Sequence, residues 1–139
     1  MIKQILTSKR GEMYMEVIVT FIIIISLLLF CLSALQVASV RNTGDIICNY
    51  LLETATFYGE FGSEFSDAVN TMKEMDPGLE FEVAVDGDWF NSTLQRVQFG
   101  DSMTVTITYS VTIRGFGSFL KIPLTSVRTG ASENYWKVV

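Results

Sequence analysis

The sequence contains no histidine, and only two prolines and two cysteines among its 139 residues. Without histidine, catalysis by Ser-His-Asp or Cys-His groups and zinc sites with imidazole ligands are excluded. The cysteines, Cys31 and Cys48, are 17 positions apart. That is about 25 Å along a continuous helix, whereas a disulfide needs Cα atoms within about 7 Å. We therefore expect two thiols that are buried or interfacial, with a link between subunits as the alternative, and we expect neither a cofactor nor a metal.

Formal charge is missing from the stretch between Val17 and Val40. As an α-helix its 24 residues measure roughly 36 Å, more than the ~30 Å hydrocarbon core of a bilayer. The stretch is apolar all round, unlike a helix on the surface of a soluble domain. We expect it to span a membrane as a helix that includes Val17, Phe21, Ile25, Leu29, Leu32 and Val40.

Charge on the two sides of this stretch differs in sign. Lys3, Lys9 and Arg10 make the first eleven residues basic, while positions 41–139 hold seven basic and thirteen acidic residues. The positive-inside rule then predicts a cytoplasmic N-terminus and an outer C-terminal domain. An acidic exterior also argues against nucleic acid as a partner, because phosphate binding needs a basic face.

A glycine follows the basic pair, and a carboxylate stands at the edge of the apolar run. Gly11 is followed by Glu12, and Glu16 is the fifth residue counted from Glu12. This arrangement resembles the type IV prepilin signal, in which a dedicated peptidase cuts after a glycine and leaves a hydrophobic helix with glutamate at its fifth position. The resemblance implies cleavage between Gly11 and Glu12.

A physical reason supports the position of Glu16. Cleavage after Gly11 would create an α-ammonium group at Glu12, at a helix end that already carries partial positive charge. Within a bundle of apolar helices an unpaired cation costs several kcal/mol. The Glu16 carboxylate, on the same or a neighbouring subunit, would offset that cost, so we expect Glu16 to form an assembly ion pair.

Beyond Val40 the pattern becomes amphipathic, which predicts that the same helix continues out of the membrane. The expected apolar stripe consists of Ile47, Leu51, Thr54 and Tyr58, widened by Ile46, Tyr50, Phe57 and Phe61. Ser63 is predicted to cap a second helix with apolar positions at Phe65, Ala68, Val69, Met72 and Met75. A turn is expected at 76–78, where proline and glycine follow an aspartate.

After Gly78 the hydrophobic period shortens to two residues, which indicates strands with one buried face. Strands are expected around 81–85, at 94–99, at 103–114 and at 120–128, with a break at 115–117. Pro123 lacks an N–H group, so the last strand should lie at a sheet edge. The aromatic pair Tyr135 and Trp136 should dock on the domain.

These elements predict an α+β fold in which one long N-terminal helix packs its outer half on a small antiparallel sheet. The expected parts are a basic leader at 1–11, the transmembrane half of the helix at 12–40, and an extracytoplasmic domain at 41–139. This order resembles type IV pilins and pseudopilins. It is most similar to Tad-type minor pilins (TadE-like) and to pilin-like proteins of Gram-positive mobile elements, in which an ending like that at 132–137 also occurs.

The resemblance implies a structural filament subunit of the cell surface, in a pilus or in a secretion or conjugation system, and not an enzyme. The implied partners are copies of itself or other pilins, a prepilin peptidase, an inner-membrane assembly platform and the lipid bilayer. The alternative is an unprocessed single-pass anchor for an extracellular binding or sensor module. A cleaved secretory signal is also open, because Val37, Ala38 and Ser39 fit a small-residue cleavage site, although the apolar run exceeds the usual signal-peptide core.

Weaker patterns carry ordinary structural interpretations. Asp86, Asp88 and Asn91 offer oxygens for Ca²⁺ but lack the rest of a calcium loop, so turn chemistry is the better interpretation. Phe57, Phe61 and Phe65 are interpreted as core residues and not as a ligand site.

Overall fold

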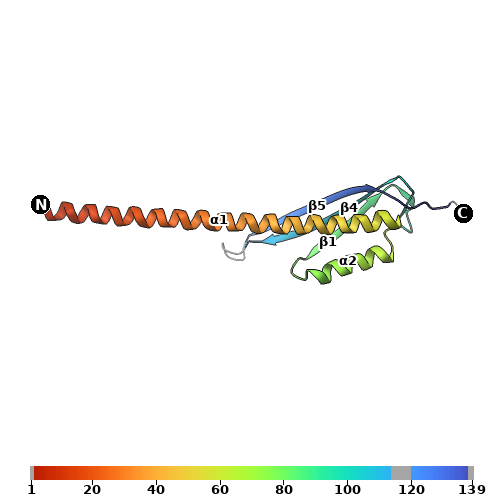
Figure 1. Ribbon diagram of the computed structural model, residues 1–139, viewed down its shortest axis with the longest axis horizontal. Helices are drawn as coiled ribbons and strands as arrows, with labels where there is room; N and C mark the ends of the chain where they lie inside the picture. Colours follow the sequence, from red (N-terminus) through yellow and green to blue (C-terminus); the bar gives the residue numbers. More distant parts are fainter. Residues whose placement is uncertain (1, 114–119, 138–139) are drawn as a thin grey trace. The chain divides into compact units, whose positions relative to one another are not determined.

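The computed structural model describes the backbone of residues 2–113 and 120–137, and the side chains of these ranges from residue 11 onwards. The chain divides into two compact units, Met1–Gln36 and Val37–Val139. One helix, α1 (Ile2–Tyr58), supplies the described part of the first unit and continues into the second (Figure 1). The absence of proline from this stretch allows one uninterrupted run of backbone hydrogen bonds.

The helix α1 ends at a glycine in the left-handed region. Gly59 has φ of +67°, and its N–H donates to the carbonyl oxygen of Ala55 at 2.8 Å. A glycine just past the last helical residue commonly ends a helix in this way, because it adopts positive φ without strain. Phe61, which the helical spacing assigned to the stripe, is buried but lies beyond the end of α1.

The second helix, α2, spans Ser63–Met75. The prediction that Ser63 caps it is wrong: Gly62 is the cap residue and makes no side-chain cap bond, while Ser63 is already helical. Of the apolar positions, Phe65 and Ala68 are buried, and Val69 and Met72 pack against the core. Met75 is 73% exposed, because it lies in the last turn just before the chain leaves the helix.

Three strands form an antiparallel sheet in the order β1-β4-β5. They are β1 (Phe81–Gly87), β4 (Ser102–Thr112) and β5 (Lys121–Ala131). Pro123 pairs with Ser110 on the edge strand β5, as its missing N–H predicts. Arg114 and the expected break at 115–117 lie outside the described residues.

A small hairpin connects β1 to β4. It consists of β2 (Trp89–Asn91) and β3 (Arg96–Val97), which pair with a register shift. The strand expected at 94–99 is therefore much shorter, because Leu94 and Gln95 belong to the turn and Gln95 has φ of +49°. The bridge between Glu60 and Arg96 joins this hairpin to the segment after α1.

The core of the second unit lies between α1 and one face of the sheet. From α1 it takes Ile47, Cys48, Leu51 and Ala55, and from β4 it takes Met103, Val105, Ile107 and Tyr109. Figure 1 shows the strands running alongside this part of α1. The α+β fold and the packing of the outer half-helix on the sheet are thus as predicted.

The predicted stripe of α1 is only partly right. Ile47 and Leu51 are buried, but Ile46, Tyr50 and Phe57 are 59%, 43% and 65% exposed. At about 100° per residue, these three residues are centred roughly 130° around the helix from the buried residues Ile47, Cys48, Leu51 and Ala55. The sheet covers one face of α1, so it leaves this second apolar face open to solvent.

Candidate functional site

The apolar segment of α1 is long and apolar enough to cross a membrane, and none of its most apolar window is buried inside the protein. The predicted membrane residues Val17, Phe21, Ile25, Leu29 and Leu32 are all exposed. Val40 differs from them, because it belongs to the second unit and packs against the core of that unit. The exposure of so many large apolar side chains is compatible with a transmembrane anchor, because apolar surface is unfavourable in water.

The predicted cleavage site lies on this helix and is open. Gly11 and Glu12 are exposed, and a Cβ built on Gly11 would meet nothing within 4 Å. Space alone would therefore permit a larger residue at position 11.

Glu16 lies one turn beyond Glu12 on the same helix and is exposed. Its backbone carbonyl accepts a hydrogen bond from Thr20 Oγ1 at 2.8 Å. Its carboxylate forms neither an ion pair nor a hydrogen bond among the side chains of residues 11–113 and 120–137. A carboxylate beside an apolar helix thus has no cation within the described part of its own chain.

Polar side chains join α1 to the sheet in the second unit. The buried Ser126 donates through Oγ to Asp45 Oδ1 at 2.6 Å, and its Oγ lies 3.2 Å from the Tyr109 hydroxyl. Arg128 donates to Asn49 Oδ1 at 2.9 Å and lies 3.6 Å from Asp45. These contacts satisfy the polar groups of the helix face that packs on β5, so this cluster has a structural role.

The C-terminal segment holds the end of α1. Asn134 Nδ2 donates to the carbonyl oxygen of Tyr58 at 2.7 Å, and Trp136 Nε1 donates to that of Gly59 at 3.3 Å. The last carbonyls of a helix lack partners within the helix, and here the C-terminal segment supplies them. Arg96 lies over the Trp136 ring at 4.1 Å and pairs with Glu60. Trp136 therefore docks as predicted, whereas Tyr135 is 68% exposed.

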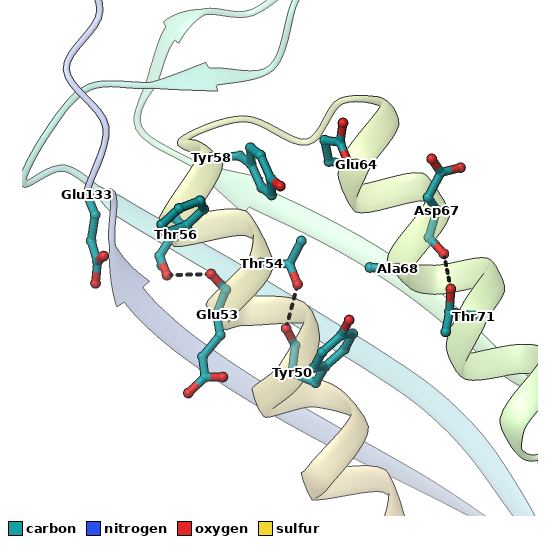
Figure 2. A pocket seen from close by; sticks show the side chains of 11 residues that line it. Tyr50, Glu53, Thr54, Thr56, Tyr58, Glu64, Asp67, Ala68, Thr71 and Glu133 are labelled. Carbon is teal, nitrogen blue, oxygen red and sulfur yellow. Dashed lines mark hydrogen bonds between the residues drawn. The ribbon is translucent and has the colours of Figure 1, made fainter.

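A surface groove of about 650 Å³ lies between α1 and α2, and we call it the α1–α2 groove (Figure 2). From α1 the lining includes Tyr50, Glu53, Thr54, Phe57 and Tyr58, and from α2 it includes Glu64, Asp67, Ala68 and Thr71. Glu133 of the C-terminal segment also lines the groove. The sequence pattern did not predict this groove. The only signal was the recurrence of acidic residues among aromatic ones between positions 50 and 67.

The cysteines and the possible calcium ligands have local explanations. Cys48 is fully buried and Cys31 is exposed, and both are free thiols. Asp86 and Asn91 accept hydrogen bonds from backbone N–H groups of their own loop, and Asp88 accepts one from Ser102 Oγ. Within the part of the chain that the structure describes, no three acidic or cysteine side chains gather as metal ligands.

Burial raises the pKa of the Cys48 thiol above its ordinary value of 9.0, and the nearby Asp45 acts in the same direction. Arg128 partly opposes this shift. The thiol lies within weak hydrogen-bond distance of the carbonyl oxygens of Val105 and Ser126. A protonated, enclosed thiol of this kind is a core residue and not a nucleophile.

Comparison with known proteins gives one family. Residues 18–137 match the family described as "Domain of unknown function (DUF4320)", so the chain belongs to that family. The match begins after Gly11, Glu12 and Glu16. Neither a curated protein nor a solved structure matches the chain.

Proposed function

We propose that this member of the DUF4320 family is a structural subunit of a type IV pilus-like filament, processed after Gly11 and assembled through its apolar N-terminal helix. The observation that carries the proposal is the Glu16 carboxylate at the start of the exposed apolar segment of α1, with no cation among the described side chains of its own chain. Cleavage after Gly11 generates the missing cation as the α-ammonium group of Glu12.

A carboxylate within a bundle of apolar helices is energetically costly unless it is paired. Removing an unpaired carboxylate from water costs several kcal/mol, and a partner of opposite charge offsets this cost. In a filament the Glu16 side chain of one subunit meets the new N-terminus of the same or a neighbouring subunit. This pairing sets the register of the helices along the filament.

The same apolar residues serve in two environments. Before assembly Phe21, Ile25 and Leu29 face lipid, with the N-terminus in the cytoplasm and the acidic domain outside. After assembly they pack against equivalent helices, so burial of apolar surface is retained when the subunit leaves the bilayer. The role is structural and non-enzymatic, and the partners are other pilins, a prepilin peptidase and a membrane assembly platform.

Intact-mass measurement and N-terminal sequencing test the cleavage. The full chain, co-expressed with a prepilin peptidase and extracted from membranes, should begin at Glu12. The Gly11→Leu variant should keep residues 1–11, and space at position 11 makes this change harmless to the helix. A wild-type chain that still carries residues 1–11 would contradict processing and favour an unprocessed anchor with an outer binding or sensor module.

Assembly is tested separately at Glu16. The Glu16→Gln variant should be cleaved and remain in the membrane but should assemble poorly, measured as the sheared filament fraction. Glu12→Ala is the control, because it removes the same charge and leaves the new α-ammonium group in place. Equal assembly of Glu16→Gln and wild type would rule out the ion pair.

A further inference from the structure

The α1–α2 groove combines aromatic walls with an acidic rim. Figure 2 shows Tyr50, Thr54 and Tyr58 on the side of α1 that faces α2, opposite Glu64 and Asp67. Tyr50 and Tyr58 are 43% and 39% exposed, so both rings remain available to a partner. Exposed aromatic surface that is rimmed by polar groups marks interaction sites more often than scattered apolar residues do.

All four charged side chains that line the groove are acidic: Glu53, Glu64, Asp67 and Glu133. None of these carboxylates has an ion pair or a hydrogen bond among the described side chains. Figure 2 shows Glu64 and Asp67 on α2, whereas Glu53 and Glu133 lie on the side of α1 that points away from α2. A cation placed in the groove would therefore meet the carboxylates of Glu64 and Asp67 first.

Three basic residues of the same unit are engaged elsewhere. Arg96 pairs with Glu60 and stacks on Trp136, Arg128 pairs with Asp45, and Lys73 lies over the ring of Phe81. None of the three lines the groove. Among the described residues that line the groove none is basic, so a basic partner would meet no competing cation in the lining.

Charge also decides which kind of molecule fits. A second copy of this chain is disfavoured as the occupant of the groove, because positions 41–139 hold thirteen acidic and only seven basic residues and so offer few cations to its carboxylates. Phosphate-bearing partners are repelled by the same carboxylates. A small ligand would require an enclosed pocket that covers most of its surface, whereas the charged and aromatic lining of this groove is exposed.

We propose that the α1–α2 groove docks a basic segment of another protein. Arginine or lysine side chains of the segment lie between Glu64 and Asp67 and over the rings of Tyr50 and Tyr58, while an apolar residue of the segment contacts Phe57. Arginine suits this site because its planar group pairs with carboxylates and stacks on aromatic rings. The proposal goes beyond filament assembly and does not depend on cleavage after Gly11.

Fluorescence anisotropy with the full chain in maltoside micelles tests the proposal. The probe is a fluorescein-labelled synthetic peptide of arginine and leucine, and the comparison peptide carries neutral citrulline in place of every arginine. Empty micelles give the background. The arginine peptide should bind the chain at physiological ionic strength, and the citrulline peptide should bind at least about tenfold more weakly.

Variants locate the binding. Glu64→Gln combined with Asp67→Asn should weaken the arginine peptide about tenfold, and Tyr50→Ala should weaken it without a change of charge. The matched control, Glu80→Gln with Glu82→Gln, removes two charges outside the groove and should change affinity by less than about twofold. Unchanged thermal unfolding shows that each variant is folded.

Three results would overturn the proposal. The first is no binding of the arginine peptide above the micelle background, and the second is equal binding of the citrulline peptide. The third is an equal loss of affinity in the groove variant and the control variant, which would reveal general attraction to an acidic domain.

Discussion

At the scale of single residues, Gly59 shows how one position ends a long helix. Its φ of +67° favours glycine, and its carbonyl oxygen accepts hydrogen bonds from Val97 N and Trp136 Nε1. A Cβ at this position would lie 2.6 Å from Asn134 Cβ and 2.9 Å from Ser132 Oγ. The end of α1 and the C-terminal segment therefore fit together only around a residue without a side chain.

Gly59→Ala should lower the free energy of unfolding by about 2–3 kcal/mol, since backbone strain and steric overlap act together. The change is measured by thermal or urea unfolding in detergent, followed by tryptophan fluorescence, which Trp136 reports directly. Gly78→Ala is the control, because its nearest contact would be 3.5 Å away and it should change stability little. Equal stability of Gly59→Ala and wild type would refute this account of the helix end.

Cys48 gives a prediction about pH. Its raised pKa keeps the thiol neutral in the folded state at pH values where the unfolded thiol ionises. The resulting stabilisation is fully present below pH 9.0 and is lost as pH rises through the folded-state pKa. In a Cys31→Ser background, iodoacetamide should modify Cys48 much more slowly in the folded protein than in urea at pH 8–9. Equal rates would contradict the burial of the thiol.

At the scale of elements, α1 and β4 approach closely where glycine meets tyrosine. A Cβ on Gly44 would overlap the ring of Tyr109, whose hydroxyl donates to the carbonyl oxygen of Arg41 at 3.4 Å. Replacement of glycine by alanine usually stabilises a helix by about 1 kcal/mol. At position 44 the overlap reverses that gain.

Gly44→Ala should therefore destabilise the domain by about 1–3 kcal/mol, measured by urea unfolding in detergent. Tyr109→Leu removes the overlapping ring, so the double variant should be less destabilised than the sum of the two single variants. A double-mutant cycle measures this coupling. Strict additivity would show that the two residues do not determine the distance between helix and sheet.

At the scale of the whole molecule, one helix serves both units of the chain. Its apolar segment accounts for the high hydrophobic fraction of 49%, and its continuation supplies four core residues of the domain, Ile47, Cys48, Leu51 and Ala55. Two requirements therefore act on one element: the first part must be apolar all round, and the second part must match a sheet on one face.

Two lysines introduced into the apolar segment should disturb the first requirement and leave the packing of the second part on the sheet unchanged. Ile24→Lys with Leu28→Lys costs about 5–7 kcal/mol in the membrane centre, so the fraction that resists alkaline carbonate extraction should fall sharply. Asn42→Lys with Asn70→Lys adds the same charge at exposed positions of the second unit and should leave that fraction unchanged. Retention of the first variant in the membrane fraction would contradict a bilayer-spanning role for this segment.

The sequence by itself determined the elements whose signals are local. The uncharged run at 17–40 predicts a helix that is long and apolar enough to cross a membrane, because length and composition alone decide that property. The alternation from Met103 to Ile113 predicts a strand with one buried face. Pro123 predicts that the last strand, β5, lies at an edge of the sheet. Each of these signals depends on residues close together in the chain.

Only the tertiary structure decided which face of α1 is buried. The pattern of apolar residues admits both the face with Ile47 and Leu51 and the face with Tyr50 and Phe57. The choice comes from the contact of Gly44 with Tyr109 and from the bonds of Asp45 with Ser126 and Arg128, which join residues far apart in sequence. The α1–α2 groove is a consequence of that choice, because it forms from the face that the sheet leaves uncovered.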